Sequence, residues 1–347
     1  KLCPLAFTVA VASQVQAGVT LYDKGGTSFS ADGHFNAFFT RTDNKATNET
    51  QSRVRMGFLP NYIGFNISKE AGDLTLGGRS SFWVTINDGS NSVTDTAIDV
   101  RQFYATVDGS FGQVLFGKDF GLYGRTNIFS DELLLGTGLP MANTGGVTFG
   151  NISTGYPYAV PKAQITYRTP DMNGFKLAAA ILDPQSGEAE EPNSDNSVRL
   201  EAEATYAAEM GSANLTAWVG VASGENDSAD VDASGVAYGI RIAMSGLQAT
   251  LSGFDQTGLS TALSDRVLAA ETDSDGFLVQ GSYTFGATRL VLSHGETDIA
   301  GSTTELDAIA AFYDVNDNLK LIAEFDKMSV TGSDDTNQFA VGASLSW

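Results

Sequence analysis

The sequence contains little cysteine, proline or histidine. Among 347 residues there are one cysteine, eight prolines and two histidines. Cys3 has no second cysteine with which to pair, so the predicted fold needs no disulfide. His34 and His294 lie far apart in the sequence and are expected to be ordinary residues of the fold rather than ligands. Because the chain also lacks a nucleophile elbow and any thiol beyond Cys3, an enzyme such as a lipase or protease is not predicted.

Long apolar runs are absent as well. No stretch approaches the roughly 18 consecutive apolar residues that a membrane-spanning helix requires. Apolar residues make up 42% of the chain, and the mean hydropathy is −0.06. A transmembrane β-barrel would give similar averages, because its strands alternate apolar and polar residues. The composition therefore argues against membrane helices and leaves a membrane barrel open.

Basic residues are outnumbered by acidic ones. The chain has 20 Lys and Arg against 41 Asp and Glu, which gives a formal net charge of −21. Recognition of nucleic acid through a basic surface is therefore not expected. No motif predicts a cofactor.

The first 17 residues differ from the rest of the chain. A short apolar core, 5–12, follows Lys1, and small or apolar residues at 15–17 stand where a signal peptidase would cleave. This pattern predicts the remainder of a signal peptide over 1–17, with a buried N-terminal strand or helix as the alternative. A single domain is then expected over 18–347.

Alternation of apolar and polar residues dominates the remaining sequence. From Ser28 onward sixteen segments alternate, each close to the ten or so residues with which a tilted strand crosses a bilayer. The last one ends at Trp347 and places Phe339, Val341, Ala343 and Leu345 on the same face as this terminal aromatic. Such a strand also suits a soluble β-sandwich, so alternation alone does not decide between the two folds.

Connection lengths distinguish them. Short turns are expected at 71–73, 109–112, 171–174, 210–212, 245–246, 285–287 and 316–318. Longer polar connections are expected at 41–51, 87–97, 119–161, 183–197, 223–234, 255–275, 295–304 and 329–337. Seven short turns alternating with eight long loops predict an all-β, sixteen-stranded, up-and-down antiparallel transmembrane barrel whose ends meet on the short-turn side.

The longest connection, 119–161, carries apolar residues that water would not favour. Phe129, Leu133, Leu134 and Leu135 all fall within it. A loop of about 40 residues in a compact domain is usually functional. We therefore expect this third long loop to fold inward and pack against the barrel wall.

Two local motifs suggest chemistry that their context contradicts. Residues 112–118 have the Gly-x-x-x-x-Gly-Lys spacing of a phosphate-binding loop, but Asp119 replaces the required Ser or Thr and the segment is strand-like. Residues 314–318 resemble the start of a calcium loop, but the sixth position is Leu319, so a turn is predicted.

Acidic residues gather in the long loops. The two groups are Glu271, Asp273 and Asp275, and Glu225, Asp227, Asp230 and Asp232. Divalent cations that bridge such loops to lipopolysaccharide are one hypothesis, and a solvated, repulsive loop surface is the other.

Several segments together resemble the general, trimeric porins of Gram-negative bacteria. They are 22–26, 101–105, 111–118, 165–170, 173–175, 283–286 and the terminal aromatic strand. Their order and spacing cover nearly the whole chain after residue 17. The resemblance implies an outer-membrane homotrimer whose third loop narrows the lumen of each barrel.

In that family, carboxylates on the third loop face arginines on the wall across the narrowest point. The resemblance assigns these roles to Asp131 and Glu132 on the loop and to Arg55, Arg101 and Arg168 on the wall. Alternation places Arg55 and Arg168 on the inner face but is unclear at Arg101. The chain departs from the family at 133–136, which replaces a Pro-Glu-Phe-Gly-Gly-type sequence, and at Asp32, which occupies a basic wall position.

The function predicted from these features is passive diffusion of small hydrophilic solutes and ions through a water-filled pore. The acidic composition predicts a preference for cations. Lipopolysaccharide and outer-membrane lipid are the expected partners besides the other protomers. The alternatives are a substrate-specific channel with a binding site at the constriction, and a barrel that serves as an adhesin or structural protein without conducting.

Overall fold

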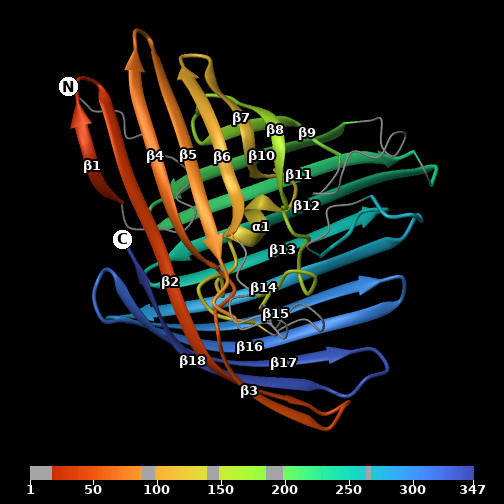
Figure 1. Cartoon of the computed structure of the whole chain (residues 1–347). Coiled ribbons are helices and arrows are strands. Elements are labelled where there is room, and N and C mark those ends of the chain that lie inside the picture. The colour runs from red at the N-terminus through yellow and green to blue at the C-terminus, as the bar shows by residue number, and fades with distance from the viewer. Residues whose placement is uncertain (1–17, 88–97, 139–147, 185–197, 228, 263–266) are drawn as a thin grey trace.

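The structure is a computed structural model that describes residues 18–87, 98–138, 148–184, 198–227, 229–262 and 267–347. The predicted signal peptide, 1–17, lies outside these residues. The described part forms one antiparallel β-barrel with one short helix (Figure 1). The strands are β1 (Val19–Lys24), β2 (Thr27–Asn44), β3 (Glu49–Arg55), β4 (Asn61–Ala71), β5 (Leu74–Val84), β6 (Ile98–Gly109), β7 (Gly112–Phe120), β8 (Pro161–Arg168), β9 (Phe175–Leu182), β10 (Arg199–Met210), β11 (Ala213–Asn226), β12 (Val231–Met244), β13 (Leu247–Thr257), β14 (Asp273–Phe285), β15 (Thr288–Ile299), β16 (Ser302–Asp314), β17 (Leu319–Val330) and β18 (Thr336–Ser346), and the helix is α1 (Arg125–Phe129).

The eighteen described strands occupy sixteen positions around the ring. β3 and β4 follow one another along the same edge of β2, and β1 and β18 share its other edge. Each of these two pairs therefore counts as one position. The pairing of β18 with β2, from Asn44 opposite Thr336 to His34 opposite Ser346, closes the barrel. The predicted sixteen-stranded barrel is confirmed, and closure leaves no free sheet edge among the described strands.

The alternating sequence determines which side chains face outward. In β18, Phe339, Val341 and Leu345 are exposed on the outside, whereas Gln338 and Ala340, which alternate with them, are fully buried. The same pattern leaves large apolar side chains exposed on every strand from β4 to β18, including aromatic residues near the short turns. An apolar outer face and a polar interior are the arrangement that a bilayer requires.

The turns agree with the predicted alternation of lengths, with a difference at the long-loop end. All seven predicted short turns connect consecutive strands, and Ser245 and Gly246 both have positive φ, as a two-residue hairpin requires. The expected loops 41–51 and 295–304 are mostly strand, since pairing continues to Asn44 opposite Glu49 and to Ile299 opposite Ser302. Backbone pairing does not need apolar side chains, so these polar strands continue beyond the apolar band.

The closing seam between β18 and β2 has no room for an extra side-chain atom at one position. A Cβ added at Gly342 would overlap the carbonyl oxygen of Ala37 and the ring of Phe38. At Gly281, on the outer face of β14, an added Cβ would meet nothing within 4 Å.

We therefore expect Gly342→Ala to destabilise the barrel, because the two closing strands must separate slightly to accept the methyl group. Overpacking of this kind costs about 1–3 kcal/mol. The measurement is the temperature at which the folded, fast-migrating form converts to the unfolded form in detergent, which should fall for Gly342→Ala and stay unchanged for Gly281→Ala. Equal conversion temperatures for the two variants would contradict the tight seam.

Candidate functional site

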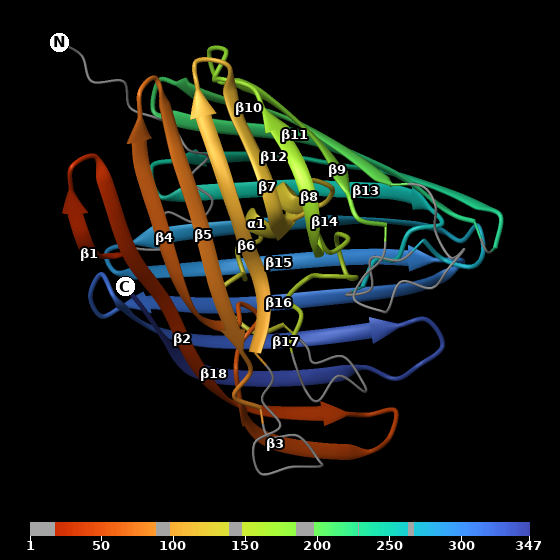
Figure 2. The ribbon, with the colours of Figure 1, turned by 45° about the horizontal axis from the view of Figure 1, so that its top comes forward.

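The segment between β7 and β8 folds into the barrel. Figures 1 and 2 both place α1, which belongs to this segment, within the ring of strands. The apolar residues that the sequence singled out are covered, with Leu133 at 0% and Leu134 at 8% exposure. Leu133 packs in a cluster with wall residues of β15, β16 and β17, and Leu134 packs with aromatic residues of the loop and of β4 and β5. The predicted inward folding of the third long loop is confirmed.

A buried carboxylate on β10 holds the beginning of this loop. Glu201 accepts hydrogen bonds from the backbone N–H groups of Leu122 (2.6 Å) and Tyr123 (2.9 Å), and Arg199 donates to it at 2.7 Å. One strand further on, the Trp218 indole donates to the side chain of Asn127 at 2.9 Å. These contacts place the first turn of the loop against β10 and β11.

A second buried carboxylate, Glu324 on β17, holds the loop farther along. It accepts hydrogen bonds from the backbone N–H groups of Thr137 (3.0 Å) and Gly138 (2.5 Å) and from the Thr137 hydroxyl (3.0 Å). Gln338 on β18 donates to the Gly138 carbonyl at 2.7 Å. At Gly136 a Cβ would overlap Glu324, which explains glycine there. Two wall carboxylates thus satisfy loop N–H groups that would otherwise be buried without acceptors.

The two loop carboxylates predicted for the constriction turn toward the wall. Asp131 accepts hydrogen bonds from Tyr156 (2.5 Å), Gln280 (2.7 Å) and Asn151 (3.0 Å), and its exposure is 5%. Burial raises the pKa of Tyr156, and the charge of Asp131 raises it further, so this phenol stays protonated and donates.

Glu132 forms an ion pair with Arg289 on β15 at 2.5 Å and accepts a hydrogen bond from Gln248 on β13. Its side chain is 2% exposed, and this burial raises the pKa of the carboxyl group although Arg289 opposes the shift. Both loop carboxylates therefore fasten the loop to β13, β14 and β15 instead of presenting charge to open solvent.

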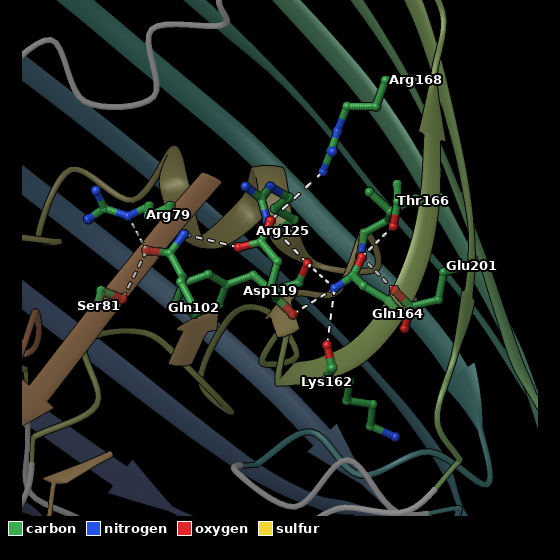
Figure 3. Close-up of polar contacts among 12 residues, drawn as sticks. Arg79, Ser81, Gln102, Asp119, Arg125, Lys162, Gln164, Thr166, Arg168 and Glu201 are labelled. Atoms are coloured by element: carbon green, nitrogen blue, oxygen red, sulfur yellow. Dashed lines mark hydrogen bonds and ion pairs between the residues drawn. The ribbon is translucent and has the colours of Figure 1, made fainter. Parts of the chain in front are cut away.

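Arginines gather on the other side of the ring. β6, at the centre of this cluster, is eight strand positions from β14 in a ring of sixteen, so the cluster lies opposite the strands that hold Asp131 and Glu132. On β5, Arg79 pairs with Asp32 of β2 at 2.7 Å and donates to Gln102 of β6 at 2.8 Å. Gln102 in turn donates to Asp119 of β7 at 3.0 Å, which links Arg79 to the next part of the cluster (Figure 3).

Asp119 is the acceptor at the centre of this cluster. Arg125 of α1 lies 3.3 Å from it and Arg168 of β8 lies 4.0 Å from it (Figure 3). The arginine side chains are 22% and 26% exposed, whereas that of Asp119 is 2% exposed. Arg79 is likewise more exposed, at 16%, than its partner Asp32, at 7%. These two groups therefore present positive charge to the interior, because their carboxylates are more covered than their guanidinium groups. The order is reversed at Arg101, which is 22% exposed against 54% for its partner Asp99.

The structure unites some of the predicted residues and separates others. Asp32 and Arg168 are joined through the chain that runs from Arg79 to Asp119. Arg101 also faces inward, but it pairs with Asp99 at 2.7 Å, bonds the Tyr158 hydroxyl at 3.2 Å and lies over the Trp83 ring. A shift of register between β5 and β6 explains why alternation was unclear at Arg101. Arg55 faces inward as predicted, but it is only 1% exposed. It therefore does not contribute to the arginine surface, which comprises Arg79, Arg125 and Arg168.

Sequence reasoning missed several basic residues of the interior, among them Arg79, Arg289, Arg241 and Arg125. Alternation could have identified Arg79, because Leu76 and Phe82 point outward, and Arg289, because Leu290 and Leu292 do. Arg241 is framed in the same way by two exposed isoleucines. Arg125 lies on α1, within the loop, where the alternation of a strand cannot show whether a side chain faces inward or outward.

The predicted cation clusters remain predictions. Asp273 accepts a hydrogen bond from Thr257 at 2.6 Å, and Asp275 stands opposite Asp255 and Asp298 in neighbouring strands. In the described ranges, no group of three or more His, Cys, Asp or Glu residues is arranged to hold a metal ion. The same ranges contain no helix with the length and apolar character needed to cross a membrane.

Fold and interior together define a class of protein, the transmembrane β-barrel whose lumen holds an inward-folded loop opposite a charged wall. A family model described as Gram-negative porin matches residues 5–344. The chain is 32% identical to Outer membrane protein U of Vibrio cholerae serotype O1 over 117 residues, which are 33% of this chain and 32% of that protein. The matched part is thus about a third of that relative.

Solved structures share the fold. An anion-selective porin from Comamonas acidovorans superposes with a TM-score of 0.72 at 13% identity, over 92% of this chain and all of that one. OmpT of Vibrio cholerae in its trimer form gives 0.57 at 16% identity, over 93% of this chain and all of the other. The chain belongs to the Gram-negative porin family, whose members are outer-membrane channels and not enzymes.

The loop anchor at Glu324 can be tested directly. Glu324→Ala removes the acceptor for two backbone N–H groups and one hydroxyl, and each bond to a charged group contributes about 1.5–3 kcal/mol. We expect the loop to detach locally, which should raise the noise and the mean value of the single-channel current. Glu209→Ala, which removes an exposed carboxylate near a short turn, is the control and should leave both unchanged. Identical current traces for the two variants would mean that Glu324 does not hold the loop.

Proposed function

We propose that the protein forms a water-filled channel through which small hydrophilic solutes and ions diffuse passively. The observation that carries this proposal is the division of the barrel interior into two sides. Buried carboxylates fasten the loop to β10 and β17 and, through Asp131 and Glu132, to β13–β15. The arginines of β5 and β8 lie on another part of the wall, where Arg125 of the loop joins them. A narrow path between charged walls favours solutes that keep polar partners and disfavours apolar ones.

The preferred ion depends on which charges the path meets. The net charge of −21 led to an expectation of cation preference, but net charge includes residues remote from the path. Inside the barrel, the carboxylates of Asp119 and Glu132 are covered, and the guanidinium groups that pair with them are partly exposed. We therefore propose a preference for anions at the constriction. The acidic loops at the mouth of the barrel would act in the opposite direction and favour cations.

The Comamonas acidovorans porin is described as anion-selective. At 13% identity this neighbour shares the fold and not a matched set of side chains. The proposal of anion preference therefore rests on the exposed arginines of this chain.

The test of ion preference is the reversal potential of single channels under a KCl gradient. We expect its sign to indicate anions, and Arg79→Gln should shift it toward cations, because the substitution also leaves Asp32 unpaired. One charge at ~10 Å in water contributes about 0.4 kcal/mol, which is roughly a twofold change in the permeability ratio. Lys69→Gln removes an exposed positive charge from the outer face and should leave the potential unchanged. A cation-selective wild type would restore the expectation drawn from net charge.

We also propose that three copies assemble in the membrane. The proposal follows from family membership and from the trimer form of the OmpT structure. The measurement is the mass of the detergent-purified folded protein by light scattering after correction for bound detergent. Three chain masses, together with conductance that closes in three equal steps, are expected. A monodisperse particle of one chain mass would contradict the trimer.

A further inference from the structure

A pocket of about 440 Å³ lies at the short-turn end of the barrel, away from the arginine surface of β5–β8. Its walls are the loop segment 129–135 on one side and strands β11–β15 with the turns 212 and 244–247 on the other. The volume lies in the range of small-molecule sites. We name this space the short-turn pocket.

Arg241 of β12 is the notable polar group of the short-turn pocket. Its neighbours Ile240 and Ile242 are exposed on the outer face, so the guanidinium group points into the barrel. Within the part of the chain that the structure describes, Arg241 makes no hydrogen bond and no ion pair. Other arginines of the interior, such as Arg79 and Arg289, each have a carboxylate at 2.7 Å or less.

The charges that face Arg241 leave it available to an external anion. Glu132 is the carboxylate that attracts it, but this carboxylate is already bonded to Arg289 and Gln248 and is 2% exposed on its side chain. Asp131 is occupied by Tyr156, Gln280 and Asn151. Arg289 is 25% exposed and lies 4.3 Å from the centre of the Phe312 ring, with its remaining donors near the pocket. The solvent-facing groups are therefore two guanidinium groups.

The rest of the lining suits the body of an organic molecule. Phe129, Leu134 and Leu135 of the loop provide an apolar side, and Asn214 and Ser282 add small polar groups. A guanidinium group binds a carboxylate through two parallel hydrogen bonds, which gives affinity and orientation together. A simple inorganic anion would use the arginine but leave the apolar side unfilled.

We propose that the short-turn pocket binds small organic carboxylates, with the carboxylate paired to Arg241 and the apolar part against Phe129, Leu134 and Leu135. The inference rests on the chain being a porin. It is tested separately from the proposed anion preference, because the pocket is tested at Arg241 and the anion preference at Arg79. The pocket would then be a transient binding site for organic carboxylates near the short-turn mouth of the channel.

The test is block of the single-channel current by benzoate, with benzamide as the uncharged analogue. Benzoate, added to either compartment in turn, should interrupt the current in a saturable manner, and benzamide should not. Arg241→Gln should raise the half-blocking concentration ~10-fold, as expected for the loss of a charge-assisted pair. Arg241→Lys keeps the charge without the two-pronged geometry and should give an intermediate value.

Two controls separate this pocket from the general field of the pore. Lys69→Gln should leave the half-blocking concentration within about twofold, and Arg79→Gln should shift the reversal potential without a larger change in block. Equal block in wild type and Arg241→Gln would overturn the proposal, as would an equal loss of block in Arg79→Gln. If the folded protein does not conduct, the diffusion proposal fails, but the pocket can still be tested by calorimetric titration with benzoate. Binding to wild type that is lost in Arg241→Gln would support the pocket. Absence of binding to wild type would overturn it.

Discussion

The arrangement of the lumen depends on hydrogen bonds from loop backbone N–H groups to two buried wall carboxylates, Glu201 and Glu324. A loop inside a barrel cannot satisfy its backbone through a regular ladder, so the wall must supply acceptors. Because these acceptors stand on β10 and β17, the loop is held at two places far apart on the ring. The part of the wall formed by β5 to β8 carries the arginines of the interior cluster, which Arg125 of the loop completes.

Because carboxylates are used in this way, the net charge of the chain and the charge that faces the lumen can differ in sign. A net charge of −21 would by itself suggest an acidic pore. Several interior acids instead serve as acceptors for the backbone or as partners of arginine, and they are covered as a result. In the proposed channel, the partly exposed guanidinium groups would set the field that a permeating ion meets. Electrostatic interactions depend on burial and distance more than on totals, so composition is a poor guide to selectivity.

The same anchoring creates two electrostatic environments on opposite sides of the loop. On one side Arg79, Arg125 and Arg168 share carboxylates within a connected hydrogen-bond chain. On the other, Glu132 is committed to Arg289, and Arg241 remains without a bonded partner in the described structure. One loop thus both lines the general path and forms a wall of the short-turn pocket.

The barrel, its sixteen positions, its short turns and the inward loop were all predictable from the sequence, because alternation and turn residues act locally and repeat along each strand. Alternation also indicated the inner face for Arg168, and with closer reading it would have indicated Arg79 and Arg289. Only the tertiary structure decided which charges meet. Asp32 and Arg79 meet across β4 at Gly64, which has no side chain to separate them, and Asp131 and Glu132 find wall partners more than 100 residues away. Burial and pairing are properties of the assembled barrel, and they determine whether a carboxylate presents charge or anchors a loop.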